Sequence, residues 1–171
     1  MTEIRVVSLV PSVTETLLAW GLTPVAVTRF CEQPGLLSVG GTKDPDIGAV
    51  VALRPELVVV NDEENRREDA VALEAAGLDL HVVSIESVSD VAPQLVALRR
   101  RLGLPPLEPE FTADPPSPAA VRAFVPIWRR PWMALNRATY GSSVLTHLGV
   151  ANVFADAGDR YPTITLEAAA A

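Results

Sequence analysis

The stretch from Val39 to Leu78, VGGTKDPDIGAVVALRPELVVVNDEENRREDAVALEAAGL, decides the fold. It combines a glycine turn, a short helix expected over 46–53, an apolar strand over 56–60, an acidic loop and a second helix over 65–76. The strand is one continuous apolar run, which is typical of a parallel strand covered on both faces. Because it runs directly into NDEENR, polar side chains are expected at the carboxyl end of a sheet, where open α/β folds bind ligands. Function is therefore expected in this loop.

The same alternation extends on both sides of this stretch. Strands are expected over 5–10 and 24–28 around a helix over 11–20, followed later by a strand over 80–85 and a helix over 88–102. Three segments, LLAWGLTPVAVT, ALEAAGLDLHVV and LTHLGVANVFA, repeat the order of helix end, glycine and apolar strand. Alternating helix and strand predict a mainly parallel sheet.

The organisation predicted is α/β, with a Rossmann-like parallel-sheet lobe over 1–103. Residues 104–121 are rich in proline and acids and lack apolar periodicity, so they are predicted to form a linker. Residues 122–171 are predicted to form part of a second α/β lobe, with strands over 122–128 and 152–155 around a helix over 140–148.

Composition excludes several classes of function. A net charge of −7 repels a phosphate backbone, which argues against nucleic acid as a partner. Apolar runs stay far below the roughly 18 residues that a membrane span needs. Cys31 is the single cysteine, so neither an intrachain disulfide nor a Cys-x-x-Cys metal pair is possible, and no metal site is predicted. The first residues, MTEIRVVSLVPS, lack the features of a secretory signal, so a cytoplasmic location is expected, with a periplasmic or lipoprotein location as the alternative if the start is misassigned.

Three motifs in order carry a resemblance to a known family: RVVSLVPSVTETLLAWGL, VGGTKDPDIGAVVALRPELVVVNDEENR and WMALNRATYGSSVLTHLGVANVFAD. They resemble the cobalamin and siderophore (class III) binding proteins of ABC importers, also called helical-backbone metal receptors, and the cobalamin-binding branch above all. The resemblance implies two α/β lobes joined by a long helix, with a ligand such as cobalamin held in the cleft between them.

Three departures from the family pattern limit what the resemblance implies. A proline-rich segment stands where the connecting helix is expected, and the second lobe ends early. The family docks on its permease through one glutamate in each lobe. Glu167 matches the second of these, but the first falls at Gly48, which argues against an ABC permease as partner.

Several residues of the first lobe are candidates for ligand contact. Ser12 and Glu15 fit a capping box, although Ser12 also lies on the cleft side in this resemblance. Phe30 follows the second strand, where a family aromatic packs on the ligand ring, and burial beneath the loop is the alternative. Thr42 and Lys43 follow a glycine turn at the cleft edge. The acidic loop adds its own candidates, for which helix capping is the alternative: Glu63, Glu64 and Asn65.

The second lobe offers a smaller set of candidates. Trp128 and Trp132 bracket two arginines and a proline, and tryptophan near a cleft rim suggests a flat ligand or a subunit contact, with core packing as the alternative. Arg137 and Tyr140 resemble the family segment that lines the second wall. Glu167 is assigned to partner docking.

Four hypotheses follow from these observations. The first is a cytoplasmic, non-catalytic protein that binds a corrinoid such as cobalamin as its ligand. The second is the substrate-binding component of an importer for cobalamin or an iron-siderophore. The third is a small enzyme acting through NDEENR, although adjacent acids on one loop do not supply the opposed carboxylates that hydrolysis uses. The fourth is a lobe that forms a homodimer through its unfinished sheet edge.

Overall fold

A computed structural model describes residues 4–106 and 121–170. The chain divides into two compact units, residues 1–84 with 98–104 and residues 85–97 with 105–171, and each is described separately below. Most of the predicted linker, 104–121, lies outside the described residues, so the predicted domain boundaries stay a prediction.

Unit 1 contains a four-stranded parallel sheet in the order β2-β1-β3-β4. The strands are β1 (Val6–Ser8), β2 (Ala26–Val27), β3 (Leu57–Asn61) and β4 (Leu80–Val83). Val7 pairs with Ala26 on one side and with Val58 on the other, which places β1 and β3 at the centre. The predicted parallel sheet is therefore confirmed.

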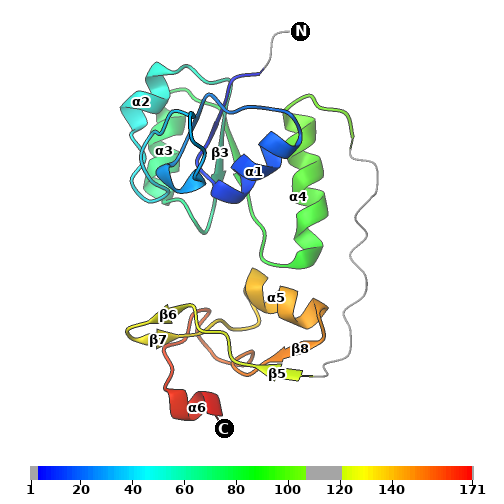
Figure 1. Ribbon diagram of the computed structural model, residues 1–171. Helices are drawn as coiled ribbons and strands as arrows, with labels where there is room; N and C mark the ends of the chain where they lie inside the picture. The colour runs from blue at the N-terminus through cyan, green and yellow to red at the C-terminus, as the bar shows by residue number, and fades with distance from the viewer. Residues whose placement is uncertain (1–3, 107–120, 171) are drawn as a thin grey trace. The chain divides into compact units, whose positions relative to one another are not determined.

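Helices cover both faces of this sheet (Figure 1). One face packs Val58 and Val60 against Val50 of α2 (Ile47–Ala52) and Leu73 of α3 (Arg67–Ala75). The opposite face is covered by α1 (Pro11–Ala19) and by the carboxyl end of α4 (Val88–Arg101), where Leu98 is buried. Each fully buried leucine or valine contributes roughly 1.5–3 kcal/mol, so the central strands and the helices packed on them stabilise this unit together.

Glycine ends the helices of all three predicted repeats. Gly21, Gly77 and Gly149 follow α1, α3 and α5 (Tyr140–His147) with φ of 77°, 83° and 74°. In this left-handed conformation a residue without Cβ is unstrained, and the chain turns from helix into strand. The repeat predicted from the sequence is confirmed.

Helix α1 begins at Pro11 as predicted, but its N-terminal cap differs from the prediction. Pro11 is the first helical residue and Val10 is the N-cap, without a side-chain cap hydrogen bond, so the capping box at Ser12 and Glu15 is wrong. Proline favours this position because its fixed φ suits the helix and its missing N–H needs no partner there. At α4 the carboxylate half of such a box is present, because the Asp90 carboxylate accepts hydrogen bonds from the Ser87 N–H and hydroxyl.

Unit 2 contains two small sheets. β5 (Val121–Ala123) and β8 (Val150–Asn152) pair in parallel, while β6 (Trp128–Arg129) and β7 (Trp132–Met133) form an antiparallel hairpin. Helix α5 precedes β8, and a short α6 (Leu166–Ala170) follows (Figure 1). The single strand predicted over 122–128 is thus replaced by β5, an irregular segment and β6. No helix among the described residues is long and apolar enough to cross a membrane.

Candidate functional site

The sheet of unit 1 has a topological switch point between β1 and β3. From β1 the chain crosses to β2 on one side and then to β3 on the other, so the loops after β1 and β3 diverge at the carboxyl edge. In open α/β sheets this is the place where ligands bind. The loop after β3 is the NDEENR segment that the sequence singled out.

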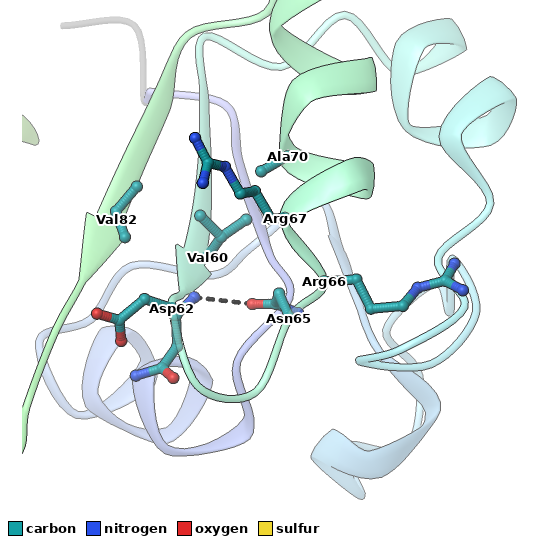
Figure 2. Close-up of a pocket in the computed structure, with 8 residues that line it drawn as sticks. Val60, Asp62, Asn65, Arg66, Arg67, Ala70 and Val82 are labelled. Carbon is teal, nitrogen blue, oxygen red and sulfur yellow. Dashed lines mark hydrogen bonds between the residues drawn. The ribbon is translucent and has the colours of Figure 1, made fainter.

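Asn65 fixes this edge by joining three loops. Its side-chain carbonyl accepts a hydrogen bond from the Asn61 N–H at 2.7 Å (Figure 2). Its amide donates to the carbonyl oxygens of Leu9, after β1, and Thr42, in the glycine turn, at 3.1 and 3.0 Å. Asn65 is buried, and the N-cap of α3 is Arg66 rather than Asn65 or Glu64, so the alternative that these residues cap the helix is wrong. The polar atoms of Asn65 instead support the backbone.

Two further side chains complete this support. Asn61 accepts hydrogen bonds from the N–H groups of Glu63 and Glu64, and Lys43 donates to the Glu63 carbonyl at 2.7 Å. Burial raises the pKa of the Glu64 carboxyl above its ordinary value, while the positive charge of Lys43 opposes the shift. We call the joined loops 9–12, 39–46 and 61–66 the edge platform.

Phe30 lies beside the glycine turn at the carboxyl end of β2. It belongs to a short 3₁₀ turn, η1 (Arg29–Cys31), and 53% of it is exposed, so it is not buried beneath the loop. The Arg29 guanidinium lies 4.9 Å from the ring centre and forms hydrogen bonds of 2.8 and 3.0 Å with Asp44. The Phe30 ring therefore contacts the Arg29 guanidinium, which Asp44 holds in place, and remains accessible to a ligand.

Cys31 of the same turn points the other way. Its Sγ lies in the core, 3.2 Å from the Thr14 hydroxyl and 3.3 Å from the Thr28 hydroxyl. A buried thiol held in this way acts as a small packing residue. Phe30 and Arg29 are thus the residues of the turn whose side chains lie at the surface.

A pocket of about 220 Å³ lies between α3 and strands β3 and β4 (Figure 2). Val60, Ala70 and Val82 supply apolar walls, and Figure 2 shows Arg67 extending past Ala70 and Val60. Asp62 and Asn65, from the acidic loop, line it as well. The sequence predicted a role for the acidic loop but not for Arg67 and Ala70. These two residues line the pocket because of their positions around the axis of α3.

Unit 2 presents exposed aromatic residues. Trp128 on β6 is 64% exposed, whereas Trp132 on β7 is half-buried with Arg129 lying 5.9 Å from its ring centre. Tyr140 is exposed at the first position of α5. Arg137 is exposed, but it donates to the Ala155 carbonyl and pairs with Asp156. Trp128 is therefore not a core residue.

A buried polar network that the sequence did not reveal holds this surface. The Asn152 amide donates to the Leu135 carbonyl at 2.7 Å and to the Ser142 hydroxyl at 3.0 Å. Thr139 caps α5 and donates to the Asn136 carbonyl at 2.8 Å. Only the Thr-x-x-Ser spacing before α5 was a sequence signal, and it indicates a cap rather than a network.

Comparisons with known proteins agree with this geometry, although no family model matches the chain. A vitamin B12-binding protein of Salmonella choleraesuis (strain SC-B67) is 28% identical over 178 residues, covering 95% of this chain and 67% of the relative. The crystal structure of the periplasmic vitamin B12 binding protein BtuF of Vibrio cholerae gives a TM-score of 0.75 at 23% identity, covering 95% of this chain and 71% of that one. The predicted family resemblance is confirmed.

A third similar structure widens the range of ligands. The periplasmic heme-binding protein BhuT, in complex with two hemes, gives a TM-score of 0.74 at 17% identity and covers 97% of this chain and 72% of that one. Together the solved structures confirm the predicted α/β fold class.

The expected cytoplasmic location is wrong. It is contradicted by the similar solved structures, which are of proteins named as periplasmic. The expectation rested on twelve residues at the start of the sequence.

Proposed function

We propose that this protein binds a corrinoid, of the cobalamin kind, and does not transform it. The observation that carries the proposal is the exposed Phe30 ring at the switch-point edge, in a chain that vitamin B12-binding relatives match over 95% of its length. A corrin ring is flat and largely apolar, and aromatic side chains bind such ligands by stacking.

The edge platform supplies the polar part of the unit 1 surface. Ser12 and Lys43 are exposed, and Glu64 is half-buried. Because Asn65 and Asn61 hold the loops by hydrogen bonds to the backbone, these groups are positioned before ligand arrives. Positioning in advance reduces the entropy lost on binding. Thr42 and Glu63 contribute through the backbone, since their carbonyl oxygens already accept from Asn65 and Lys43.

The unit 2 surface supplies further aromatic area. Trp128 and Tyr140 offer exposed rings, and Trp132 offers the part of its ring that Arg129 leaves accessible. Arg137 reaches ligand only if its surface pair with Asp156 opens, which costs little because exposed pairs are worth about 0–1 kcal/mol.

Binding is favoured over catalysis by the way the reactive groups are held. The Cys31 thiol is enclosed by two threonine hydroxyls, and the carboxylates of Asp62, Glu63 and Glu64 come from one loop. The relatives are named as binding proteins.

Calorimetric titration with cyanocobalamin tests the proposal, with hydroxocobalamin and a ferric siderophore for comparison. We expect micromolar or tighter binding of cobalamin, and Phe30→Ala should weaken it about tenfold, as the loss of one stacked ring would. Val71→Ala is a matched control, because Val71 on α3 is 54% exposed and lies away from the edge platform. No heat with any ligand would overturn the function, while equal affinities for Phe30→Ala and the control would overturn the site.

A second candidate is the substrate-binding component of an importer. Glu167 is exposed in the first turn of α6, as a docking carboxylate would be. Gly48 on α2 is also exposed and has room for a side chain, since a Cβ there meets Asp46 at an ordinary 3.5 Å. Sedimentation with vesicles that contain a cobalamin permease tests this role. Glu167→Ala should weaken binding and Gly48→Glu should strengthen it, and the absence of both effects would exclude docking.

A further inference from the structure

The hairpin of unit 2 carries a positive charge that no carboxylate among residues 4–106 and 121–170 neutralises through an ion pair. Arg129 and Arg130 are adjacent at its turn, and both are exposed. Within residues 4–106 and 121–170 neither forms an ion pair. By contrast Arg137 and Arg160 of the same unit pair with Asp156 and Glu86. The chain has 21 acidic and 14 basic residues, so two adjacent arginines without a carboxylate partner in the described part of it are a feature to explain.

Aromatic rings flank these two charges. Trp128 precedes them on β6 with most of its surface exposed, and Trp132 follows on β7 with Arg129 lying 5.9 Å from its ring centre. A guanidinium beside a flat apolar surface can stack on a ring and still donate hydrogen bonds from its edge. The hairpin therefore offers ring contact and anion contact side by side.

The base of the hairpin is held on both strands. The Ile127 N–H donates to the Met133 carbonyl at 2.9 Å, which closes the hairpin itself. The following chain is bound through the Ala134 N–H to the Pro162 carbonyl and through the Ile164 N–H to the Trp132 carbonyl, at 3.0 and 2.9 Å. The arginines are thus displayed from a backbone anchored at its base, and less freedom is lost when they bind.

The net charge of the chain favours a small anion over an extended one. Screening limits exposed charges to about 8 Å at physiological ionic strength. A carboxylate on a small ligand therefore responds mainly to Arg129 and Arg130. A membrane or a nucleic acid extends beyond that distance and meets the surrounding surface of a protein whose net charge is −7.

We propose that the hairpin over 127–133 recognises free carboxylate groups on the edge of a flat ring ligand, so that the preferred corrinoid is one with acid rather than amide side chains. This inference rests on the proposed corrinoid-binding function. Arg129 and Arg130 would bind the carboxylates, and the two tryptophans would contact the ring.

Two corrinoids that differ mainly at the ring edge test the inference. Cobyrinic acid carries carboxylates, whereas cobinamide carries amides, and both are titrated in their cyano forms at low and at physiological salt. We expect the wild-type chain to prefer cobyrinic acid about tenfold at low salt, as a few charge-assisted hydrogen bonds at an exposed site would give, with a smaller preference at higher salt. Replacing both residues (Arg129→Gln with Arg130→Gln) should abolish the preference by weakening the binding of cobyrinic acid much more than that of cobinamide.

The control removes the same charge elsewhere. Arg54→Gln with Arg100→Gln alters two exposed arginines of unit 1 and should retain the preference. A lysine pair (Arg129→Lys with Arg130→Lys) keeps the charge and should retain part of the preference for cobyrinic acid. If the lysine pair loses as much of the preference as the glutamine pair does, charge is not the cause and the inference is overturned.

The remaining outcomes separate this inference from the function on which it rests. If both corrinoids bind equally to the wild-type chain, the preference for acid groups is wrong while corrinoid binding stands. If neither these two corrinoids nor cobalamin bind, the preference for acid groups and the proposed corrinoid-binding function are both wrong. Vesicles of phosphatidylcholine and phosphatidylglycerol are expected not to bind. Vesicle binding that the glutamine pair abolishes would assign the hairpin to a membrane surface and overturn the inference.

Discussion

The edge platform of unit 1 and the hairpin of unit 2 use polar residues in opposite ways. In the platform, Asn61, Asn65 and Lys43 hydrogen-bond to backbone groups of neighbouring loops. In the hairpin, Arg129 and Arg130 form no ion pair with any residue in the described part of the chain. The comparison teaches that polar side chains clustered at a sheet edge can serve to hold the backbone of neighbouring loops. Side chains available to a ligand lie instead where the backbone forms its hydrogen bonds without their help.

Among the tests of this comparison, Asn65→Ala is expected to have the largest effect on the free energy of unfolding. The change leaves the buried Leu9 carbonyl and the Asn61 N–H without their partner and should lower the free energy of unfolding by about 2–4 kcal/mol. Urea denaturation followed by circular dichroism measures it, with Glu74→Ala on the exposed surface of α3 as the control. A loss below about 0.5 kcal/mol would show that the platform does not depend on Asn65.

A smaller effect sharpens the comparison within unit 1, at His81 on β4. Burial lowers the pKa of His81, the charge of Arg101 lowers it further and the charge of Asp79 opposes the shift. The Nε2 atom of His81 has no hydrogen-bond partner among the described residues. Because the folded pKa lies below the ordinary 6.5, the neutral form favours folding. Stability is therefore complete above pH 6.5 and is lost as pH falls through the lowered pKa.

Urea denaturation at pH 7.5 and at pH 5 checks this, with His81→Gln as the comparison. The wild-type chain should lose more stability than the variant between the two pH values, and an equal loss would remove His81 as the cause. The same pH change should leave the hairpin unaffected, since arginine stays charged throughout.

Gly48 tests the first turn of α2, which directly follows the platform loop 39–46. Gly48→Glu should raise the free energy of unfolding by about 0.5–1 kcal/mol, because glycine is unfavourable in a helix and a carboxylate suits the first turn of α2. Thermal unfolding measures it, with Gly48→Ala to separate propensity from charge. A loss of stability would mean that the side chain meets a neighbour that the open space does not indicate.

The smallest effect on stability is expected at the hairpin. Trp128→Ala removes a ring that is mostly exposed and should change the free energy of unfolding by no more than about 0.5 kcal/mol, whereas Trp132→Ala, half-buried, should cost more. Both changes should weaken corrinoid binding. A large destabilisation by Trp128→Ala would show that the hairpin is structural and that the contrast with the platform is false.

The sequence predicted the elements of the fold better than their ends. Helix periodicity, apolar strands and terminal glycines indicated β1, β3, α3 and α5, because these signals act within a few residues. It failed at the cap of α1, where Ser12 and Glu15 only resemble a capping box, and at β6 and β7, which are too short to produce an alternating pattern. The candidate site was predicted as a set of loops, and the role of each residue in it was not.

By itself, the sequence determined an α/β chain with glycine-ended helices, a polar loop after β3 and the resemblance to cobalamin-binding proteins. Only the tertiary structure decided that Asn65 is a support, because its partners Leu9 and Thr42 are 56 and 23 residues away in the chain. It also decided that Phe30 and Trp128 are exposed and that Arg129 and Arg130 lack carboxylate partners within the described residues. The physical reason is that propensity is local, whereas a side chain's burial and hydrogen-bond partners are set by segments that meet only in the folded protein.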